Sequence, residues 1–425
     1  MFDLIVIGGG AAGFYAAVHA AENNPELKIA ILERGKEVLT KVKVSGGGRC
    51  NVAHAEYDPA ELVKNYPRGQ KELLGPFHTH ATGDTVSFFE DRGIPLKTEE
   101  DGRMFPTTDS SQTIVDFFLK EASRLGIQVL RHSAVTKFDQ VTFENDKVWE
   151  VTSIKKTYRA RKILVASGSS TKIWRILENL GHTIVPPIPS LFTFNIKDKR
   201  IQGIPGLSTL ARVEVFPKNI IRPKITIQLK STVAKQALLS SEGPLLITHW
   251  GMSGPAILKL SAWGAKLLHE FKYNFTIRVN WLPDYYDNSV IQLLMEIKEV
   301  EAKKTILRTK AVDIPRRLWT NLVRASGIHE NEKWADVTKE KLQQLADQLT
   351  NGRFDVVGKS AFKEEFVTAG GIDLYEIDFK TMESKLVPQL YFAGEVINVD
   401  AITGGFNFQN AWTTGFIAAQ GIVRD

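Results

Sequence analysis

The start of the chain has an order of strand, glycine turn, helix and strand that few folds accommodate. Residues 2–7 are short and apolar, as in a buried parallel strand. Residues 8–13 read GGGAAG and fit the pattern G-x-G-x-x-G. A helical pattern continues to Ala21, and an apolar strand follows at residues 28–32. This order predicts an α/β fold of the Rossmann type.

Each glycine of this turn has a separate predicted task in holding a dinucleotide. The first permits the positive φ of a tight turn, and the second lets a pyrophosphate approach the backbone. The third lets the helix pack closely on the strand, and the helix N-terminus offers free N–H groups to the phosphates. The residues predicted to contact the dinucleotide are Gly8, Gly10, Ala11, Ala12 and Gly13.

A carboxylate stands where such folds bind ribose. Glu33 lies 20 residues after Gly13, at the predicted tip of the second strand, where it can accept hydrogen bonds from ribose hydroxyls. Arg34 follows it, and this pair is equally compatible with FAD and NAD. A glycine-rich turn without a ligand is the alternative interpretation of the whole segment.

The C-terminal region supplies a second cofactor signal. A strand is predicted at residues 390–393, and residues 403–405 open a helical pattern over 407–420. A helix N-terminus there would stabilise the negative charge that builds on a flavin ring during reduction, so this segment favours FAD over NAD. An ordinary final strand–helix pair is the alternative. The predicted flavin contacts are Gly394, Glu395, Asp400, Gly404, Gly405, Phe406 and Asn407.

A glycine-rich segment at residues 41–51 reads KVKVSGGGRCN. Three successive glycines disfavour a regular helix or strand and allow close approach of a flat or anionic ligand. Arg49 is a candidate for binding phosphate or a substrate carboxylate, and Cys50 is either a packing residue or a reactive thiol. The predicted cofactor contacts here are Lys41, Ser45, Gly46, Gly47, Gly48, Arg49, Cys50 and Asn51.

Two further segments are expected near the cofactor. Residues 163–168 form a predicted buried strand that ends in a small-residue turn, which closes the nucleotide site in many flavoproteins. Arg103 follows Gly102 in a predicted turn and either faces a substrate or is structural. The additional predicted contacts are Val135, Ala166, Ser167 and Gly168.

The pattern changes after residue 190. Residues 211–216 and 224–230 alternate as antiparallel strands, and residues 288–349 have helical spacing. His249 is a candidate acid or base, or a histidine satisfied by local hydrogen bonds. We therefore predict a discontinuous FAD-binding Rossmann-like domain with an inserted β-barrel-like domain and a helical domain. The predicted boundaries are 1–190 with 359–425, 191–287 with 351–358, and 288–350.

Composition narrows the function further. The chain has 425 residues and a single cysteine, which excludes a redox-active cysteine pair within one chain and suggests a cytoplasmic location. Apolar runs are too short for a membrane span, and the histidines show no metal-ligand spacing. The net charge is +6. The densest basic run, residues 155–162, is expected on an exposed strand edge; nucleic-acid contact is the alternative.

Taken together, these segments resemble the HI0933-like (YhiN/BaiN-like) NAD(P)/FAD-dependent oxidoreductase family of bacterial flavoproteins. The resemblance covers nearly the whole chain and implies non-covalent FAD. Relatives usually have a longer loop after the strand at 163–168, which puts the contacts of that loop in doubt here. The motifs that carry the resemblance are Ile7–Gly13, Ser45–Asn51, Gly102–Pro106, Leu180–Leu191, Thr248–Pro255, Val367–Gly371 and Phe392–Gly415.

The resemblance and the residues together predict an enzyme that transfers hydride between flavin N5 and a small organic substrate. NAD(P)H or O2 is the expected redox partner, and NADH or NADPH would bind transiently because no second dinucleotide motif is present. A nucleic-acid partner is not expected, since aromatic and basic residues do not interleave. The alternatives are an FAD-dependent tRNA- or RNA-modifying enzyme and a non-catalytic redox sensor.

Overall fold

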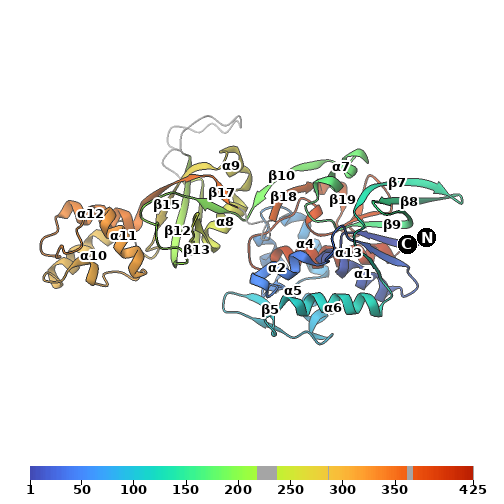
Figure 1. Ribbon diagram of the computed structural model, residues 1–425, viewed down its shortest axis with the longest axis horizontal. Coiled ribbons are helices and arrows are strands. Elements are labelled where there is room, and N and C mark those ends of the chain that lie inside the picture. Colours follow the sequence, from blue (N-terminus) through green and yellow to red (C-terminus); the bar gives the residue numbers. More distant parts are fainter. Residues whose placement is uncertain (218–236, 286, 361–366, 425) are drawn as a thin grey trace. The chain divides into compact units, whose positions relative to one another are not determined.

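The computed structural model describes residues 1–217, 237–285, 287–360 and 367–424 (Figure 1). The predicted strand at 224–230 therefore lies outside the described residues. The chain forms two compact units, Met1–Pro189 with Lys363–Asp425, and Ser190–Phe362. The finer division of the second unit into a β-rich and a helical domain stays a prediction.

The first unit is built on a twisted sheet whose centre is parallel. Strand β1 (Phe2–Ile7) lies between β2 (Ile29–Leu32) and β9 (Thr157–Val165) and runs parallel to both. β6 (Gln128–Leu130) extends the sheet beyond β2, and β21 (Leu390–Phe392) pairs in parallel with β9. The last strand of the chain order, β21, thus lies in the same sheet as the first strand, β1, as in a Rossmann-like domain.

Most cations of the basic run at 155–162 are exposed, as expected, but the expectation of a sheet edge is wrong. Strand β9 pairs with β1 on one side, and with β8 (Asp146–Ser153) and β21 on the other. The cations of the run also have partners within the chain. Lys155 donates to the Arg131 carbonyl at 2.9 Å, and Arg159 pairs with Glu150 at 3.3 Å.

Two helices from opposite ends of the chain pack against each other beside this sheet (Figure 1). They are α1 (Ala11–Asn23) and α13 (Phe406–Val423). A Cβ added to Gly415 would lie 2.9 Å from the Ala12 carbonyl oxygen, so the helices touch backbone to backbone. Small residues at the crossing permit this approach, and buried Tyr15 and Trp412 pack beside it with ring centroids 5.2 Å apart.

The remaining elements of the first unit complete its layers. They are α2 (Thr40–Gly48), β3 (Ala53–His54), α3 (Pro59–Leu62), η1 (Val63–Asn65), α4 (Gln70–Thr79), α5 (Thr82–Glu90), β4 (Leu96–Thr98), β5 (Arg103–Pro106), α6 (Ser111–Arg124), β7 (Val135–Phe143), α7 (Thr171–Asn179), β10 (Ile184–Ser190), β18 (Val367–Ile372), η4 (Leu374–Glu376), β19 (Ile377–Asp378), β20 (Glu383–Ser384) and η5 (Gly394–Val396).

The second unit has an antiparallel sheet and a group of helices (Figure 1). Its strand order is β16-β15-β12-β13-β14-β11-β17. On β16 buried and exposed residues alternate, so one face of the strand packs on a core. The elements are β11 (Thr193–Asn195), β12 (Ser208–Pro217), β13 (Leu239–Ile247), β14 (Gly251–Ser253), α8 (Pro255–Trp263), α9 (Ala265–Glu270), β15 (Asn274–Asn280), α10 (Asp287–Val300), η3 (Ile306–Arg308), α11 (Arg316–Ala325), α12 (Lys339–Thr350), β16 (Gly352–Val357) and β17 (Lys359–Ser360).

Among the described residues, no helix combines the length and the hydropathy that crossing a membrane requires.

Candidate flavin site

The glycine turn between β1 and α1 is closed on two sides and open on a third. Gly8 has φ +119°, and a Cβ there would stand 2.3 Å from the Ala166 carbonyl oxygen. A Cβ on Gly13 would stand 2.2 Å from the Gly8 carbonyl oxygen. At Gly10, however, no atom of the described residues other than its chain neighbours lies within 4 Å of that position. The space that a phosphate needs is therefore present at the N-terminus of α1.

Glu33 lies beside this turn, at the end of β2. Its Oε2 accepts a hydrogen bond from Gly9 N at 3.0 Å, and its Oε1 accepts one from Gly35 N at 2.7 Å. The carboxylate is thus within reach of the position predicted for a ribose, while Arg34 is exposed. The roles of both residues in cofactor binding stay predictions.

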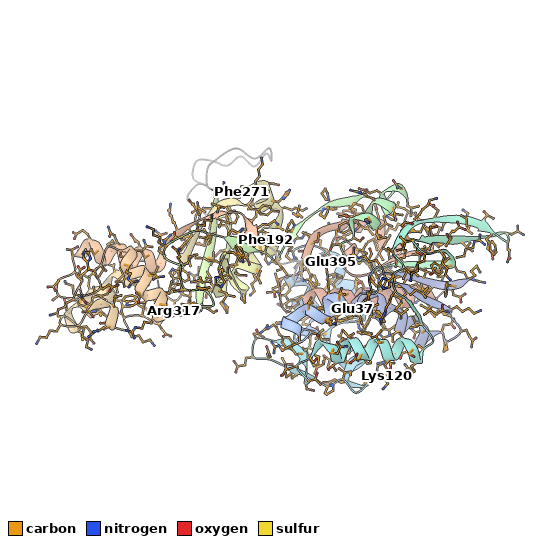
Figure 2. All side chains as sticks on the ribbon, viewed as in Figure 1. Glu37, Lys120, Phe192, Phe271, Arg317 and Glu395 are labelled. Carbon is orange, nitrogen blue, oxygen red and sulfur yellow. The ribbon has the colours of Figure 1, made fainter. Side chains whose placement is uncertain are left out.

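The C-terminal segment meets this turn from the other end of the chain. A Cβ on Gly394, whose φ is +74°, would lie 2.9 Å from the Ala12 Cβ. Glu395 (Figure 2) pairs with Lys41, and its Oε1 accepts a hydrogen bond from Thr368 N at 3.2 Å. Its other carboxylate oxygen, Oε2, is 3.6 Å from the Cβ position of Gly168. The contacts predicted at residues 12, 41, 168, 394 and 395 therefore lie close together in space.

Half-buried Ser167, whose hydroxyl oxygen is itself buried, adds an observation that fits a ligand. Its hydroxyl has no hydrogen-bond partner within the described part of the chain, and its Cα stands 2.9 Å from the Cβ position of Gly8. A buried hydroxyl without a partner is costly, and a bound group or water relieves that cost. An orphaned hydroxyl next to an open helix N-terminus is the arrangement that a dinucleotide pyrophosphate fits.

The second glycine turn, before α13, is held by groups of the protein itself. Gly405 has φ +97°, and a Cβ there would lie 2.5 Å from the Ala53 carbonyl carbon. With its amide oriented to satisfy its neighbours, buried Asn51 accepts a hydrogen bond from Gly405 N at 2.9 Å. Its NH2 group donates to the Ala53 carbonyl at 2.9 Å and to the Met104 carbonyl at 3.2 Å. Its amide thus supports the turn, and the predicted contact of Asn51 with the cofactor stays a prediction.

Two of the predicted contacts at this turn have local partners. Asn407 accepts a hydrogen bond from Ala401 N at 3.0 Å and donates to the Ala401 carbonyl at 3.1 Å. The Phe406 carbonyl accepts a hydrogen bond from buried Tyr66 at 2.6 Å. These bonds fix the first turn of α13, whose positive dipole end is the part of the helix that a reduced flavin would use.

His54 is a residue of this site that the sequence did not reveal. Its Nδ1 is 3.0 Å from the Gly404 carbonyl oxygen, and its ring stacks on Phe406 at 4.5 Å. Because a carbonyl only accepts, Nδ1 carries the proton in this contact. The residue follows the glycine-rich segment by a few positions in a two-residue strand, and no spacing rule singles it out.

The glycine-rich segment folds as a short helix that breaks down at the glycines, as their number predicted. Helix α2 loses helical conformation at Ser45, Gly46 and Gly47, and the last two have φ +57° and +70°. A Cβ on Gly46 would lie 2.8 Å from the Phe105 ring. Neither Gly47 nor Gly48 has a described atom within 4 Å of its Cβ position, chain neighbours aside, so this part of the segment is open.

Cys50 and Asp400 were predicted to contact the cofactor, and their contacts stay predictions. Cys50 is 0% exposed, and burial raises the pKa of its thiol to about 12, which keeps it protonated. Asp400 is also 0% exposed and forms an ion pair with Arg68. In this conformation neither side chain has exposed surface, so a direct contact with the cofactor would come from the backbone of these residues.

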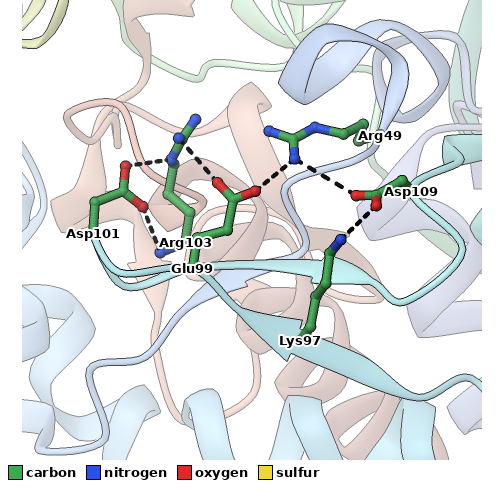
Figure 3. Close-up of polar contacts among 6 residues, drawn as sticks. All are labelled: Arg49, Lys97, Glu99, Asp101, Arg103 and Asp109. Carbon is green, nitrogen blue, oxygen red and sulfur yellow. Dashed lines mark hydrogen bonds and ion pairs between the residues drawn. The ribbon is translucent and has the colours of Figure 1, made fainter.

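A network of ion pairs lies beside the glycine-rich segment, on β4, β5 and the loop before α6 (Figure 3). Arg49 contacts Glu99 at 2.6 Å and Asp109 at 3.6 Å, and its guanidinium stacks 4.0 Å from the Phe105 ring centroid. Lys97, the main cause, and Arg49 lower the pKa of the Asp109 carboxyl. In this conformation Arg49 is engaged by carboxylates, and an incoming anion would have to compete with them.

Arg103 belongs to the same network (Figure 3). Its guanidinium contacts Asp101 at 2.7 Å and Glu99 at 3.1 Å. These contacts give it a structural role in the hairpin, which was one of the two predicted interpretations, and its contact with a substrate stays a prediction.

Three further predicted residues remain to be placed. Val135 begins β7 and is half-buried, and Ala166 is buried. His249 is exposed on the turn between β13 and β14, in the second unit.

The comparison with known proteins identifies the family. The sequence profile described as "HI0933-like protein Rossmann domain" matches residues 2–421. The chain belongs to the HI0933-like family. It is therefore a flavoprotein with a Rossmann-like FAD-binding domain, from a family of FAD-dependent oxidoreductases.

Three relatives are similar over almost their whole length. A "Ribosomal RNA dihydrouridine synthase" of Haemophilus influenzae is 28% identical over 99% of this chain and 98% of the relative. One of the same name from Escherichia coli is 29% identical over the same shares. A "3-dehydro-bile acid delta(4,6)-reductase" of Clostridium scindens is 26% identical over 98% of this chain and 97% of the relative.

A solved structure supports the fold alone. A 3-ketosteroid-Δ4-(5α)-dehydrogenase of Rhodococcus jostii has a TM-score of 0.50 and 10% identity, and covers 100% of this chain and 97% of its own. The relatives named for ribosomal RNA also bear on the expected partners. The expectation that nucleic acid is not a partner has no support from them.

Proposed function

We propose that this protein is an FAD-dependent reductase that saturates a carbon–carbon double bond conjugated to a carbonyl group, with a uracil base of RNA as the substrate. The observation that carries the proposal is the open glycine turn at Gly10, placed beside Gly394 and Glu395 from the other end of the chain. When bound, FAD would supply a two-electron centre, with NADPH or NADH as the hydride source; one carbon of the substrate double bond would take the hydride and the other a proton from solvent.

The names of the relatives support the choice of bond. Dihydrouridine is uridine with its C5–C6 double bond saturated, and that bond is conjugated to a carbonyl. A Δ4,6 double bond beside a 3-oxo group is also a conjugated enone. Two relatives of different substrate size thus share one type of acceptor, and they match this chain over almost its whole length.

The chain's own residues would hold and orient the cofactor. The amides at the start of α1 and the Ser167 hydroxyl would bind the pyrophosphate, and Glu33 would accept hydrogen bonds from ribose. Asn51 and His54 would keep the α13 turn fixed, so that the positive helix end does not have to reorganise when negative charge develops.

A reductase of a small enone is the second candidate, and it retains our expectation of a small organic substrate. The bile-acid relative supports it. Under this alternative the same flavin site acts on a free molecule, and RNA is neither bound nor modified.

The test starts from the purified yellow protein under anaerobic conditions. NADPH and NADH are added in turn, and the loss of oxidised flavin absorbance is followed. The reduced protein is then mixed with unmodified ribosomal RNA, with a 3-oxo-4-ene steroid, or with air. We expect rapid reoxidation by RNA, and dihydrouridine detected by mass spectrometry of the RNA digest.

The other outcomes separate the alternatives. Reoxidation by the steroid but not by RNA would favour the second candidate. Fast reoxidation by air alone would indicate an oxidase. A flavin that no donor reduces and no acceptor oxidises would indicate a non-catalytic flavin-binding protein, and a protein that stays colourless with added FAD would refute the flavin site itself.

A further inference from the structure

The net positive charge of the chain comes from the second unit. Residues 190–362 contain 26 lysines and arginines against 16 aspartates and glutamates, which gives a net charge of +10. The rest of the chain contains 28 against 32, a net charge of −4. An overall charge of +6 therefore hides an acidic unit that carries the flavin site and a basic unit inserted into it.

One segment of the second unit concentrates this charge. Residues 303–317 read KKTILRTKAVDIPRR, with six cations and a single acid. The structure exposes all six cations, whereas Ile306 and Ile314 of the same segment are 0% and 7% exposed. The Trp319 indole, one turn into α11, donates a hydrogen bond to the Ile306 carbonyl at 3.2 Å. The segment is therefore anchored by its apolar residues and presents its cations to solvent.

Few of these cations are neutralised by the protein. Lys304 pairs with Glu301 at 2.6 Å and Lys310 with Asp313 at 2.9 Å, and exposed pairs of this kind are weak and easily exchanged. The other four side chains have no ion-pair or hydrogen-bond partner among the residues that the structure describes. They are Lys303, Arg308, Arg316 and Arg317 (the last labelled in Figure 2).

The fold brings one more cation, Lys333, beside residues 303–317, although it lies later in the sequence. Thr305 and Lys333 pair as an antiparallel bridge, and Trp334 N donates to the Lys304 carbonyl at 3.1 Å. Lys333 is exposed beside the segment. Three glutamates precede residues 303–317, on α10 and in the turn after it. They are Glu296, Glu299 and Glu301, and the basic segment begins after them. We call the following set the basic surface: Lys303, Lys304, Arg308, Lys310, Arg316, Arg317 and Lys333.

We propose that the basic surface binds the phosphate backbone of the RNA that the flavin site modifies. This inference rests on the proposed function with RNA as substrate. Arginine guanidinium groups match phosphate geometry, and the release of counterions from RNA by such clusters dominates its affinity for proteins. The flavin unit has a net negative charge and does not supply this attraction.

An anionic membrane is the rival partner for a cationic surface, and the segment does not fit it. Membrane-surface binding needs a broad exposed apolar face beside the cations. Here the apolar side chains of residues 303–317 are buried or half-buried. The charge alone is presented, which suits a hydrated polyanion such as RNA.

The test compares two quadruple variants of the full-length protein with bound FAD. The first replaces Arg308, Arg316, Arg317 and Lys333 by Gln. The control replaces four exposed cations of the first unit by Gln: Lys71, Lys120, Lys147 and Arg175. Fluorescence anisotropy measures the binding of a labelled, uridine-containing ribosomal RNA fragment at several salt concentrations. Thermal melting and flavin reduction by NADPH check that both variants are folded.

We expect the first variant to bind RNA at least about tenfold more weakly at low salt, and its slope of log affinity against log salt to fall by about 3. The control should stay close to the wild type, because its cations lie on the acidic unit. Flavin reduction by NADPH should be unchanged in both variants, since the basic surface contributes nothing to that step.

Two results would overturn the inference in distinguishable ways. If the wild type binds and reduces RNA and the first variant binds it equally well, the basic surface is not the RNA site, and the proposed function stands. If the wild type does not bind RNA but binds phosphatidylserine vesicles, the surface serves a membrane, and RNA as substrate falls with it. If the same protein then reduces the steroid, the proposed flavin reductase activity stands without RNA as its substrate.

Discussion

The two glycine turns that open α1 and α13 look alike in the sequence and are built for different tasks. In the first, a Cβ added to Gly8 or Gly13 would stand 2.3 or 2.2 Å from a backbone carbonyl oxygen, while the Cβ position of Gly10 faces open space. In the second, the Gly405 N–H donates a hydrogen bond to Asn51, and a Cβ added to Gly405 would lie 2.5 Å from the Ala53 carbonyl carbon. One turn leaves room for a ligand, and the other is filled by the protein.

The difference teaches that a glycine motif carries two kinds of information. Some of its glycines are required because another backbone comes too close, and their loss damages the fold. Others are required because a ligand comes close, and their loss damages binding alone. Substitutions at matched positions of the two turns separate these cases.

The largest effect is expected for Gly13→Val, at the closed side of the first turn. The new side chain would begin 2.2 Å from the Gly8 carbonyl oxygen, so α1 would have to move away from β1. We expect a loss of at least about 3 kcal/mol in the free energy of unfolding, together with loss of bound FAD. Denaturant unfolding and flavin absorbance measure both. A variant as stable as the wild type would show that α1 does not pack as described.

Acid is expected to loosen the helix pair behind both turns. His80 bonds the Tyr15 hydroxyl of α1 at 2.8 Å and stacks on Phe416 of α13, and burial lowers its pKa from 6.5 to about 4. Below pH 6.5 the unfolded chain binds a proton that folded His80 refuses, so stability is complete above pH 6.5 and falls towards pH 4. The loss from this group is about 3 kcal/mol.

Buried His19 adds to the same trend, because burial lowers its pKa to about 3. Denaturant titrations between pH 7 and pH 4 measure the slope, and His80→Gln should make it shallower. An equal slope in that variant would mean that carboxylates elsewhere account for the acid sensitivity.

Gly405→Ala tests the second turn. Its Cβ would stand 2.5 Å from the Ala53 carbonyl carbon, and a φ of +97° is unfavourable for alanine. We expect a loss of about 2 kcal/mol in stability, with FAD affinity lowered only as far as the turn shifts. Calorimetric melting with and without excess FAD separates the two effects. Unchanged stability with lost flavin would place a ligand, not Ala53, against this glycine.

The smallest effect is expected for Gly10→Ala, at the open side of the first turn. Its φ of −98° suits alanine and no described atom crowds the Cβ position, so stability should change by less than about 0.5 kcal/mol. The methyl group would occupy space that a phosphate needs, and FAD should dissociate about tenfold more readily, or about 1.4 kcal/mol. Flavin release on dilution measures this. An equal loss of stability and affinity would erase the contrast between the turns.

Sequence patterns predicted the Rossmann-like fold because its rules are local. The order of strand, turn, helix and strand at 2–32 depends on residues that are neighbours in the chain, and Glu33 follows from the same spacing. The helix after residue 406 and the breakdown of helical structure at Gly46 and Gly47 also follow from local propensity. These features were predictable from short windows.

The partners of individual side chains depend on contacts that no window contains. Asn51 meets Gly405 from more than 350 positions away, and Arg68 meets Asp400 across a similar distance. The sequence alone therefore did not reveal that Asn51 bonds the turn before α13 or that Asp400 pairs with Arg68. It also placed residues 155–162 at a sheet edge, because the pairing of β9 with β1 joins segments that lie far apart in the chain.

The buried thiol gives this protein a reporter of its own motion. Cys50 stands at the end of the glycine-rich segment, and it is the single cysteine of the chain. A reagent that reacts with thiols reaches Cys50 only when that segment opens. The labelling rate therefore reports how often the segment opens, and no cysteine has to be introduced by mutation. Comparing the labelling rate before and after FAD is supplied would show whether the bound cofactor slows the opening of the segment or leaves it unchanged.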